Sequence, residues 1–356
     1  MTKQRVLKIQ DSLKHGEAVL IANPSNRFYL TGFPSSAGYV VITAYKAMFF
    51  TDSRYFEKAQ KTVSSMTVVL LKKWMAQLSD FLDYEGVNRL FLETEHTPFS
   101  QFIHYRKELK NIKIQEDNTL DTLLCEMRCV KDKNELESIK NAQRITDAAF
   151  SYILERLHPG KSEIEIALEL EFFMRSNGSE GIAFDTIAVS GKNSSLPHGV
   201  PTEKRLEKGD FVTMDFGAKF GGYCSDMTRT VAIGQISDEQ KKVYETVLSA
   251  QKSGIEAMKA GIKGRDADRA ARSVIENAGY GKFFGHSLGH SVGIDIHESP
   301  NASPGCETAF KAGTIMTVEP GIYIPDSFGV RIEDMVYITE NGCENLTKSP
   351  KKLIVI

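Results

Sequence analysis

The sequence predicts a two-domain α/β protein, in which a small amino-terminal α/β domain at residues 1–125 precedes a larger α+β domain at residues 126–356. Three observations support this fold class. The length of 356 residues corresponds to about two domains of roughly 100–200 residues each. Hydrophobic residues make up 41% and charged residues 25%, a balance typical of globular proteins. Near residue 130 the hydrophobic pattern changes from short alternating runs to long helical periodicity.

The first domain contains short runs rich in β-branched and aromatic residues, which are typical of strands. These runs are Val19–Ile21, Gly38–Ile42, Ala47–Phe50, Thr67–Leu71 and Arg89–Leu92. Helix-like runs separate them, so we expect a small α/β domain.

The second domain opens with a pair of helices. Apolar residues recur at helical spacing from Asp132 until Gly160 ends the run. Ser162, followed by Glu165, forms a capping box that begins another helix, which ends near Gly178.

A second pair of helices follows with the same layout. A capping box at Ser237 begins a long helix that ends at Gly261, and a shorter helix ends near Gly279. Gly261 lies 101 residues after Gly160, and Gly279 lies 101 residues after Gly178. We interpret this offset as an internal duplication of a helix-helix-strand unit. Coincidence is the alternative, because glycine is common.

Charge and composition exclude several partners. Lys and Arg number 44 against 46 Asp and Glu, and no long charged run occurs, so nucleic acid is not expected as a partner. The amino terminus lacks the apolar run of a signal peptide and no stretch is apolar enough to cross a bilayer, so we expect a cytoplasmic protein without a membrane partner. The 5 Cys are scattered without a CxxC pair, as expected for reduced thiols.

A hairpin in the second domain carries two aspartates. Two alternating runs within Asp210–Val231 flank a Gly-Gly turn. A turn centred between Phe220 and Gly221 places Asp215 opposite Asp226, where like charges are destabilising unless a cation lies between them. The alternative is an exposed hairpin with acids at its edge, but the neighbouring residues are apolar.

Three more candidate ligands follow along the chain. His290 lies in the glycine-rich segment Gly285–Gly293, which predicts a tightly turned loop. Glu319 ends an apolar strand, and Glu333 lies in a strand-like run on the same face as Arg331. Singly, each has an ordinary explanation as a solvated turn or an exposed strand residue.

Together these side chains indicate a metal site. Four carboxylates and one imidazole match the charge of two divalent cations, and oxygen-rich ligation with one nitrogen suits Mn²⁺, Co²⁺ or Zn²⁺ better than copper. Two such ions can hold a hydroxide that attacks an amide bond at neutral pH. Cys224 shares a face with Asp226 and is a further candidate, although a small buried thiol is the commoner outcome.

The residues around these ligands resemble those of the pita-bread metallopeptidases, the group that contains methionine aminopeptidase, prolidase and aminopeptidase P. The matching segments, in the order Asp, Asp, His, Glu, Glu, are Asp215–Thr230, His290, Glu319–Tyr323 and Arg331–Asp334. The resemblance covers the whole second domain. It implies the pita-bread fold, whose pseudo-two-fold symmetry agrees with the repeated helix pair.

The resemblance implies a role for each ligand. Asp215 would hold one metal ion, and His290 and Glu319 the other. Asp226 and Glu333 would bridge the two ions. Glu319 would also accept the proton of the attacking water.

The resemblance also implies catalytic and substrate-binding residues. His198 and His297 match histidines that position the scissile amide and stabilise the tetrahedral intermediate, although each alone reads as an ordinary loop histidine. His286 and Arg331 align with substrate-side and carboxylate-orienting positions of the proline-specific branch, and Tyr323 aligns more loosely.

The first domain indicates which branch of the pita-bread metallopeptidases the chain resembles. Its length and its segment Phe50–Tyr55 resemble the creatinase/prolidase amino-terminal domain, which methionine aminopeptidases generally lack. The chain is therefore most similar to Xaa-Pro dipeptidase (prolidase) or Xaa-Pro aminopeptidase. This implies hydrolysis of the Xaa-Pro bond in short peptides with proline second, two divalent ions with manganese preferred over cobalt or zinc, and a homodimer.

Three alternatives stay open at this point. The first is an activity like that of methionine aminopeptidase. The second is a serine hydrolase, because Gly285-His286-Ser287-Leu288-Gly289 matches the nucleophile-elbow pattern around Ser287, although Asp295 and His297 follow too closely to complete a triad. The third is a binding protein that keeps the fold without turnover.

Overall fold

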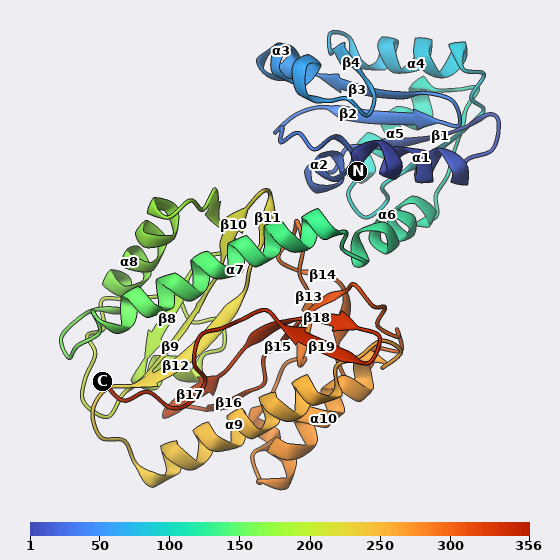
Figure 1. Ribbon diagram of the computed structural model, residues 1–356. Helices are drawn as coiled ribbons and strands as arrows, with labels where there is room; N and C mark the ends of the chain where they lie inside the picture. Colours follow the sequence, from blue (N-terminus) through green and yellow to red (C-terminus); the bar gives the residue numbers. More distant parts are fainter. The chain divides into compact units, whose positions relative to one another are not determined.

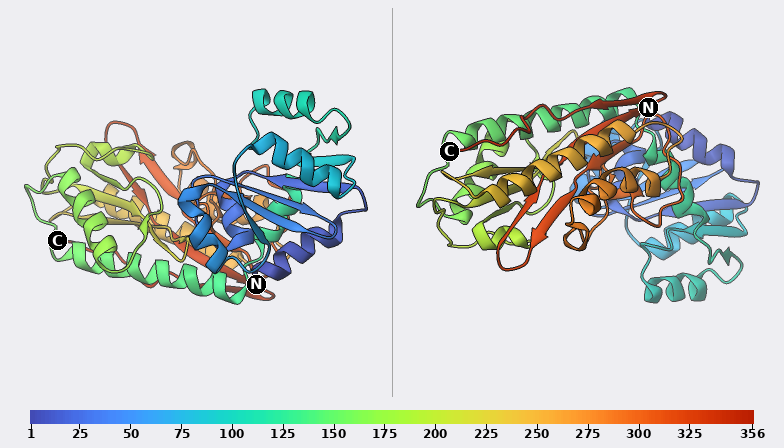
Figure 2. Two further views of the ribbon diagram at one scale, coloured as in Figure 1. Left: turned by 90° about the horizontal axis from the view of Figure 1, so that it is seen from above. Right: turned by 90° about the horizontal axis from the view of Figure 1, so that it is seen from below.

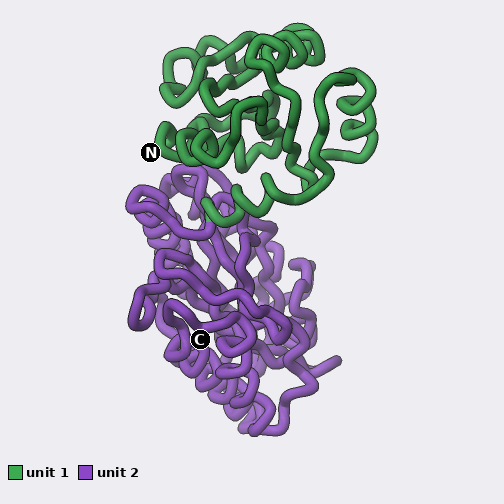
Figure 3. Tube along the Cα trace, turned by 90° about the vertical axis from the view of Figure 1, so that its right-hand side faces the viewer, with its two compact units in different colours: residues 1–128 green, residues 129–356 purple.

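The computed structural model describes residues 1–356, which form two compact units, residues 1–128 and residues 129–356 (Figure 3). Helix α6 (Thr119–Cys129) spans the position at which we expected one domain to end and the next to begin. No helix combines the length and apolarity that a bilayer span requires.

The first unit is built around one mixed sheet in the order β4-β3-β2-β1-β5-β6 (Figure 1). Its strands are β1 (Glu17–Ile21), β2 (Tyr39–Thr43), β3 (Ala47–Thr51), β4 (Thr67–Leu70), β5 (Arg89–Leu92) and β6 (Lys113–Ile114). The other helices are α1 (Thr2–Ser12), α2 (Pro24–Thr31), α3 (Ser53–Thr62), α4 (Trp74–Tyr84) and α5 (Phe99–Glu108). Every residue of β1 is buried, so helices cover both faces of the sheet. The five strand predictions for this domain are confirmed.

The second unit begins with the predicted helix pair, α7 (Lys133–Leu154) and α8 (Glu163–Ser176). Capping boxes begin both helices, at Asp132 and Ser162. The 3₁₀ turn η1 (Gly191–Ser195) and six strands follow, in sheets of order β12-β9-β8 and β11-β10-β7. The strands are β7 (Gly181–Ile182), β8 (Ile187–Ser190), β9 (Phe211–Phe216), β10 (Ala218–Phe220), β11 (Tyr223–Cys224) and β12 (Met227–Ala232).

The rest of the second unit repeats this plan. Helices α9 (Asp238–Ala257) and α10 (Gly264–Asn277) lead through η2 (Gly281–Phe283) into a sheet of order β14-β13-β15-β18-β19 and a ribbon of β16 and β17. The strands are β13 (Gly289–Ser291), β14 (Glu298–Ala302), β15 (Ile315–Val318), β16 (Gly321–Ile324), β17 (Phe328–Arg331), β18 (Asp334–Thr339) and β19 (Gly342–Asn345).

The offset of 101 residues is a structural repeat. Helices α8 and α10 each have 14 residues, and α10 begins and ends 101 positions after α8. Gly160 and Gly261 have φ of 92° and 85°, and Gly178 and Gly279 have φ of 97° and 87°. Figure 2 shows the α7–α8 pair on the near side from above and the α9–α10 pair on the near side from below, with the strands between them. Two related halves therefore meet at the central strands.

The predicted register of the hairpin is wrong. Asp215 pairs with Thr228, and not with Asp226, which lies between β11 and β12. Gly221 and Gly222, with φ of 59° and 78°, both occupy the centre of the turn. Two consecutive positive φ angles form the tight hairpin turn that glycine favours, so the turn lies one residue further along than we expected.

Two local predictions also need correction. His290 lies on the short strand β13 and not in a tightly turned loop. The pairing of β13 with β14 shifts register between His290 and Ser291, as at a β-bulge. The run that contains Glu333 is not one strand, because β17 pairs with β16 whereas β18 pairs with β15. The chain changes sheets at Ile332 and Glu333, which leaves Glu333 in the connection.

A buried ionic cluster around Asp334 ties the second unit together. The fully buried Asp334 carboxylate accepts hydrogen bonds from Arg229 Nη2 at 2.7 Å and Lys351 Nζ at 2.5 Å. Gln251 Nε2 and Asn345 Nδ2 donate to Oδ2, the oxygen that also accepts from Lys351, at 3.1 and 2.7 Å. Although burial raises the pKa of Asp334, the two cations outweigh it and the pKa is lowered. Strands β12, β18 and β19, helix α9 and the carboxyl-terminal segment therefore share one carboxylate.

Replacing Asp334 with Asn will destabilise the second unit by about 3–5 kcal/mol, because the buried Arg229 loses its counter-charge. Urea unfolding of chelator-treated protein, followed by circular dichroism, measures the loss. Asp238→Asn is the matched control, because this aspartate is fully exposed and its replacement leaves stability unchanged. A loss for Asp334→Asn as small as that of the control would contradict the role given to this cluster.

Candidate active site

The predicted site residues converge on one pocket of about 930 Å³ in the second unit. All of them except Tyr323 line this pocket. The lining members are His198, Asp215, Asp226, His286, His290, His297, Glu319, Arg331 and Glu333. The pocket therefore joins residues that are as much as 135 positions apart in the sequence, from His198 to Glu333.

The five candidate metal ligands lie at the ends of strands from both halves. Asp215 lies on β9, Asp226 precedes β12, and His290 lies on β13. Glu319 follows β15, and Glu333 lies between β17 and β18. Each therefore projects from a hydrogen-bonded strand or its end, and the sheet fixes its position.

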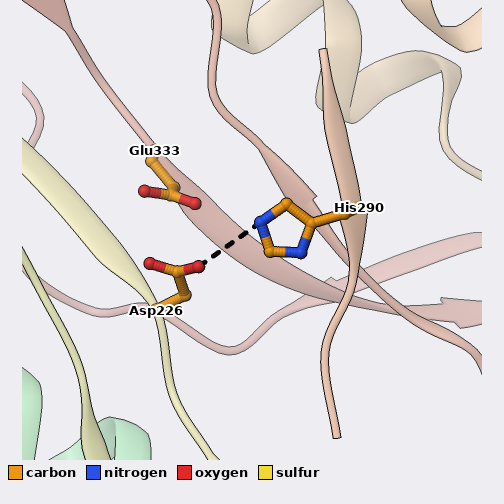
Figure 4. Close-up of side chains that lie close together, drawn as sticks. All are labelled: Asp226, His290 and Glu333. Atoms are coloured by element: carbon orange, nitrogen blue, oxygen red, sulfur yellow. Dashed lines mark ion pairs between the residues drawn. The ribbon is translucent and has the colours of Figure 1, made fainter. Parts of the chain in front are cut away.

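Three of these side chains form a close group. Ligand atoms of Asp226, His290 and Glu333 all lie within 4.8 Å of one another (Figure 4). His290 Nε2 lies 3.5 Å from Asp226 Oδ2 and 3.4 Å from Glu319 Oε1. His290 Nδ1 lies 3.1 Å from the Ser291 carbonyl oxygen, to which it can only donate. In the neutral ring Nε2 then keeps its lone pair, which faces the carboxylates as a metal ligand would.

Hydrogen bonds fix some carboxylate oxygens and leave others without a partner. Thr228 Oγ1 donates to Glu333 Oε2 at 2.7 Å, and Arg331 Nη2 donates to Asp215 Oδ2 at 2.6 Å. The remaining oxygens, Asp215 Oδ1 and Glu333 Oε1, are buried without any hydrogen-bond partner. A buried unpartnered carboxylate oxygen is costly, and a cation removes that cost. The residues present therefore fit divalent ions.

The electrostatics of the pocket support the same conclusion. Burial, followed by repulsion from the other carboxylates, raises the pKa of Asp226 and of Glu333 well above the usual values. Burial is also the main cause that raises the pKa of Glu319 to about 7. Burial lowers the pKa of His290, which favours the neutral ring. Without bound cations, Asp226, Glu319 and Glu333 therefore keep their protons to a higher pH than ordinary carboxyl groups do.

The other pocket histidines differ in burial. Burial, with help from Arg331, lowers the pKa of His286 to about 4. Burial and the neighbouring His290 lower the pKa of His297, whose ring lies against that of His290 at a centroid distance of 4.4 Å. His198 is exposed at the pocket wall. At neutral pH His286 and His297 therefore act as neutral hydrogen-bonding groups.

Arg331 connects the metal-site acids with Tyr323. Its Nη1 donates to Tyr323 Oη at 2.7 Å and to the Pro197 carbonyl oxygen at 3.1 Å. Its Nε donates to Thr228 Oγ1 at 3.0 Å. Tyr323 Oη also lies 3.1 Å from His286 Nε2. Because all three guanidinium nitrogen atoms are engaged, Arg331 in this structure orients protein groups at the pocket wall.

Two protein families match this chain. Residues 137–340 match Metallopeptidase family M24, and residues 5–130 match the Creatinase/Prolidase N-terminal domain. The chain belongs to metallopeptidase family M24. As members of this family are metallopeptidases, the acidic pocket serves divalent metal ions.

Individual relatives match over nearly the full length. An Xaa-Pro dipeptidase of Pyrococcus horikoshii is 42% identical over 340 residues, 95% of this chain and 94% of the relative. The solved Xaa-Pro dipeptidase from Bacillus anthracis has a TM-score of 0.94 at 40% identity, over 100% of this chain and 99% of that one. An X-Pro aminopeptidase from Thermotoga maritima MSB8 has a TM-score of 0.91 at 37% identity, over 98% and 100%. The predicted fold class is confirmed.

Membership of family M24 contradicts the serine-hydrolase alternative. The local structure agrees, because Ser287 lies between η2 and β13, whereas a nucleophile elbow joins a strand to a helix. Cys224 is buried, and its thiol donates to the Ile294 carbonyl oxygen at 3.4 Å.

Sequence reasoning missed the residues that support the ligands. Thr317 Oγ1 donates to Glu319 Oε1 at 2.9 Å and accepts from the His290 backbone N–H at 3.0 Å. The buried Lys131 Nζ lies 3.0 Å from Glu298 Oε2 and 3.4 Å from Ser291 Oγ, and so joins β14, which follows His297, to β13, which contains His290. Strand alternation could have indicated that Thr317 lies on the same face as Glu319. Nothing in the sequence indicated a supporting role for Lys131.

Binding of Mn²⁺ to chelator-treated protein will tighten as the pH rises from about 5 to about 8, and it will release protons. The raised pKa values of Asp226, Glu319 and Glu333 mean that these acids hold protons which the cation must displace. Titration calorimetry in two buffers of different ionisation enthalpy measures both quantities. A pH-independent affinity without proton release would show that the carboxylates are not the ligands.

Replacing Glu333 with Gln will raise the melting temperature of the metal-free protein by about 2–4 °C at alkaline pH, the shift that about 1 kcal/mol produces in a domain of this size. The substitution removes one negative charge from among buried like charges. The same variant will lose the stabilisation that Mn²⁺ gives the wild type. Calorimetric scans measure both, with the exposed Glu340→Gln as control. A lower melting temperature for metal-free Glu333→Gln would contradict the repulsion.

Proposed function

We propose that this protein is a proline-specific metallopeptidase that hydrolyses the Xaa-Pro bond at the amino terminus of short peptides. The observation that carries the proposal is the group of four carboxylates and one imidazole, with Asp215, Asp226 and Glu333 buried and the other two partly buried, in a pocket large enough for a dipeptide. The named relatives, Xaa-Pro dipeptidases and an X-Pro aminopeptidase along nearly the whole chain, support the choice of proline peptides.

The proposal includes two divalent ions, with manganese as the first choice and cobalt or zinc as alternatives. Asp215, Asp226, His290, Glu319 and Glu333 would hold them, since four carboxylates balance two divalent charges and the donor set is rich in oxygen. When bound, such ions supply Lewis acidity that lowers the pKa of water and polarises a carbonyl group. The two unpartnered buried oxygens support these assignments.

The chain's own residues provide proton transfer and orientation. Thr317 holds Oε1 of Glu319, which leaves Oε2 to accept a proton as a general base. His297, neutral and packed against His290, can donate a hydrogen bond to the developing oxyanion. His198 faces the same pocket from the opposite loop and can orient the scissile amide.

Substrate length follows from how the pocket receives a carboxylate. Arg331 is the only Lys or Arg among the lining residues, and its guanidinium nitrogen atoms are already engaged by Asp215, Thr228, Tyr323 and Pro197. A dipeptide would therefore place its carboxylate against neutral histidines. For this reason Xaa-Pro aminopeptidase activity on longer peptides is the second candidate. We also propose a homodimer, on the basis of the resemblance of the first domain.

The direct test is to strip the purified protein with chelator, restore Mn²⁺ or Co²⁺ singly, and measure hydrolysis of Ala-Pro, Ala-Pro-Ala and a Met-initiated peptide without proline. Cleavage of the proline peptides that depends on added metal is the expected result. Preference for Ala-Pro identifies a dipeptidase, and preference for Ala-Pro-Ala identifies an aminopeptidase.

A matched variant excludes a contaminating peptidase. His290→Ala removes the single imidazole ligand and is expected to abolish metal-dependent hydrolysis, whereas His158→Ala, at an exposed histidine outside the pocket, is expected to retain it. Cleavage of the Met peptide alone would overturn proline specificity. Undiminished hydrolysis after chelation would overturn the metal-dependent reaction itself.

A further inference from the structure

One of the buried carboxylates outside the metal-ligand group belongs to Glu163, the first residue of α8. Glu163 is fully buried, and its Oε1 accepts hydrogen bonds from Ser190 N at 2.6 Å and Ser190 Oγ at 2.9 Å. Its Oε2 accepts from Thr202 N at 3.0 Å and Thr202 Oγ1 at 2.6 Å. Asn193 Nδ2 lies 3.1 Å from both oxygens. Every one of these partners is neutral.

A buried carboxylate without a cationic partner is costly unless hydrogen bonds compensate for lost hydration. Six donor contacts surround Glu163, and the amino-terminal end of α8 adds the favourable field of the helix dipole. Lys204 Nζ donates to Ser190 Oγ at 3.0 Å and to Asp210 Oδ2 at 2.6 Å, and so supports one of the donors while its ion pair is made with Asp210 and not with Glu163. This degree of satisfaction indicates that the charge holds its neighbours in place.

The groups that Glu163 holds are the two ends of one loop. Ser190 ends β8, and Thr202 lies at the far end of a segment that contains η1 and His198. The first turn of α8 also holds the returning end, because Ile164 N donates to the Thr202 carbonyl oxygen at 3.2 Å. Glu163 therefore closes the base of the loop formed by residues 190–202, which we call the His198 loop.

The other side of the His198 loop is held next to the metal-ligand acids. Arg331, which donates to Asp215, also donates to the Pro197 carbonyl oxygen at 3.1 Å, immediately before His198. Gly329 N donates to Ser194 Oγ at 2.9 Å. A Cβ at Gly329 would lie 2.1 Å from the Ser194 carbonyl oxygen, so the loop packs directly on β17. The loop is thus fixed at its base and beside His198.

We propose that Glu163 is a positioning residue that holds the His198 loop so that His198 faces the bound substrate. The proposal rests on the proposed function only for the statement that His198 acts on a peptide. Glu163 itself does not line the pocket and touches neither substrate nor metal ligands. Its effect passes through the loop, because its six contacts all fall on Ser190, Asn193 and Thr202.

Glu163→Gln is the first test. Whichever way the amide is turned, its NH₂ group faces donors of Ser190 and Asn193 or of Asn193 and Thr202, so the base of the loop loosens. Misplacement by about 1 Å costs about 100-fold in rate, and we expect a loss of that order in kcat of the Mn²⁺-loaded enzyme. Mn²⁺ affinity is expected to stay at the wild-type value, since no ligand is touched.

Two variants accompany this substitution. Glu165→Gln makes the same chemical change in the same turn of α8 at an exposed residue whose capping role glutamine preserves, and it is expected to leave kcat unchanged. Thr202→Val removes one hydroxyl donor to Glu163 at nearly constant volume. It provides a milder variant if Glu163→Gln folds poorly, and it is expected to lower kcat by a smaller factor.

A double-mutant cycle with His198→Ala separates positioning from a general structural effect. If Glu163 acts through His198, Glu163→Gln or Thr202→Val causes no further loss of kcat in the His198→Ala background. Multiplicative losses would overturn the proposal, and so would a wild-type kcat in both loop variants.

Hydrogen exchange supplies a readout that is independent of peptidase activity. The amides of Ser190 and Thr202 are expected to exchange faster in Glu163→Gln than in Glu165→Gln, while amides of α9 stay equally protected. Unchanged exchange at the loop would overturn the role of Glu163 even in an active enzyme. Faster exchange in Glu163→Gln, combined with a wild-type protein that cleaves no Xaa-Pro peptide, would instead sustain the loop restraint and reject the proposed function.

Discussion

Mutual repulsion among buried carboxylates is the constraint on which the second unit depends. The same chain shows two ways to satisfy such a group. Asp334 is held by Arg229 and Lys351, and Glu163 is surrounded by neutral donors. At the pocket neither solution is complete, because Asp215 and Glu333 each keep one buried oxygen without a partner. The missing charge is positive, and divalent ions provide it in an M24 metallopeptidase.

The surrounding residues convert this electrostatic demand into a defined geometry. Thr228 receives a hydrogen bond from Arg331 and donates one to Glu333, and Arg331 in turn donates to Asp215, so this chain of contacts couples the orientation of two acidic groups. Thr317 couples Glu319 to the backbone of His290 in the same manner. Because the contacts of Thr228 link β12 in the first half of the repeat with Arg331 and Glu333 in the second, the site exists only when the halves have packed together.

Much of the fold follows from local sequence signals. Capping boxes at Ser162 and Ser237 mark the starts of α8 and α9. The glycines that close the helices mark the repeat, and its offset holds residue for residue in α8 and α10. The register of the hairpin did not follow, since alternation cannot tell whether the turn is centred before Gly221 or between Gly221 and Gly222. The site residues were identified from the order of the motifs and not from the register of the hairpin. The error in register therefore did not affect them, and Asp215 and Asp226 both line the pocket.

Other features depend on long-range packing that no local pattern encodes. Glu163 resembles any acid in the first turn of a helix until the loop from Ser190 to Thr202 folds over it. Lys131 resembles an exposed lysine before a helix until β13 and β14 bury it. A strand-like run likewise hid the change of sheet at Glu333, because both β17 and β18 have ordinary strand sequences. The candidate metal ligands and catalytic residues were thus easier to recognise in the sequence than the residues that hold them in position.

Anomalous X-ray diffraction from crystals soaked in Mn²⁺, collected on both sides of the manganese absorption edge, tests the central claim most directly. We expect anomalous peaks enclosed by the carboxylates of Asp215, Asp226, Glu319 and Glu333 and by Nε2 of His290. The absence of any peak there, with the four carboxylates turned outward to solvent, would contradict it.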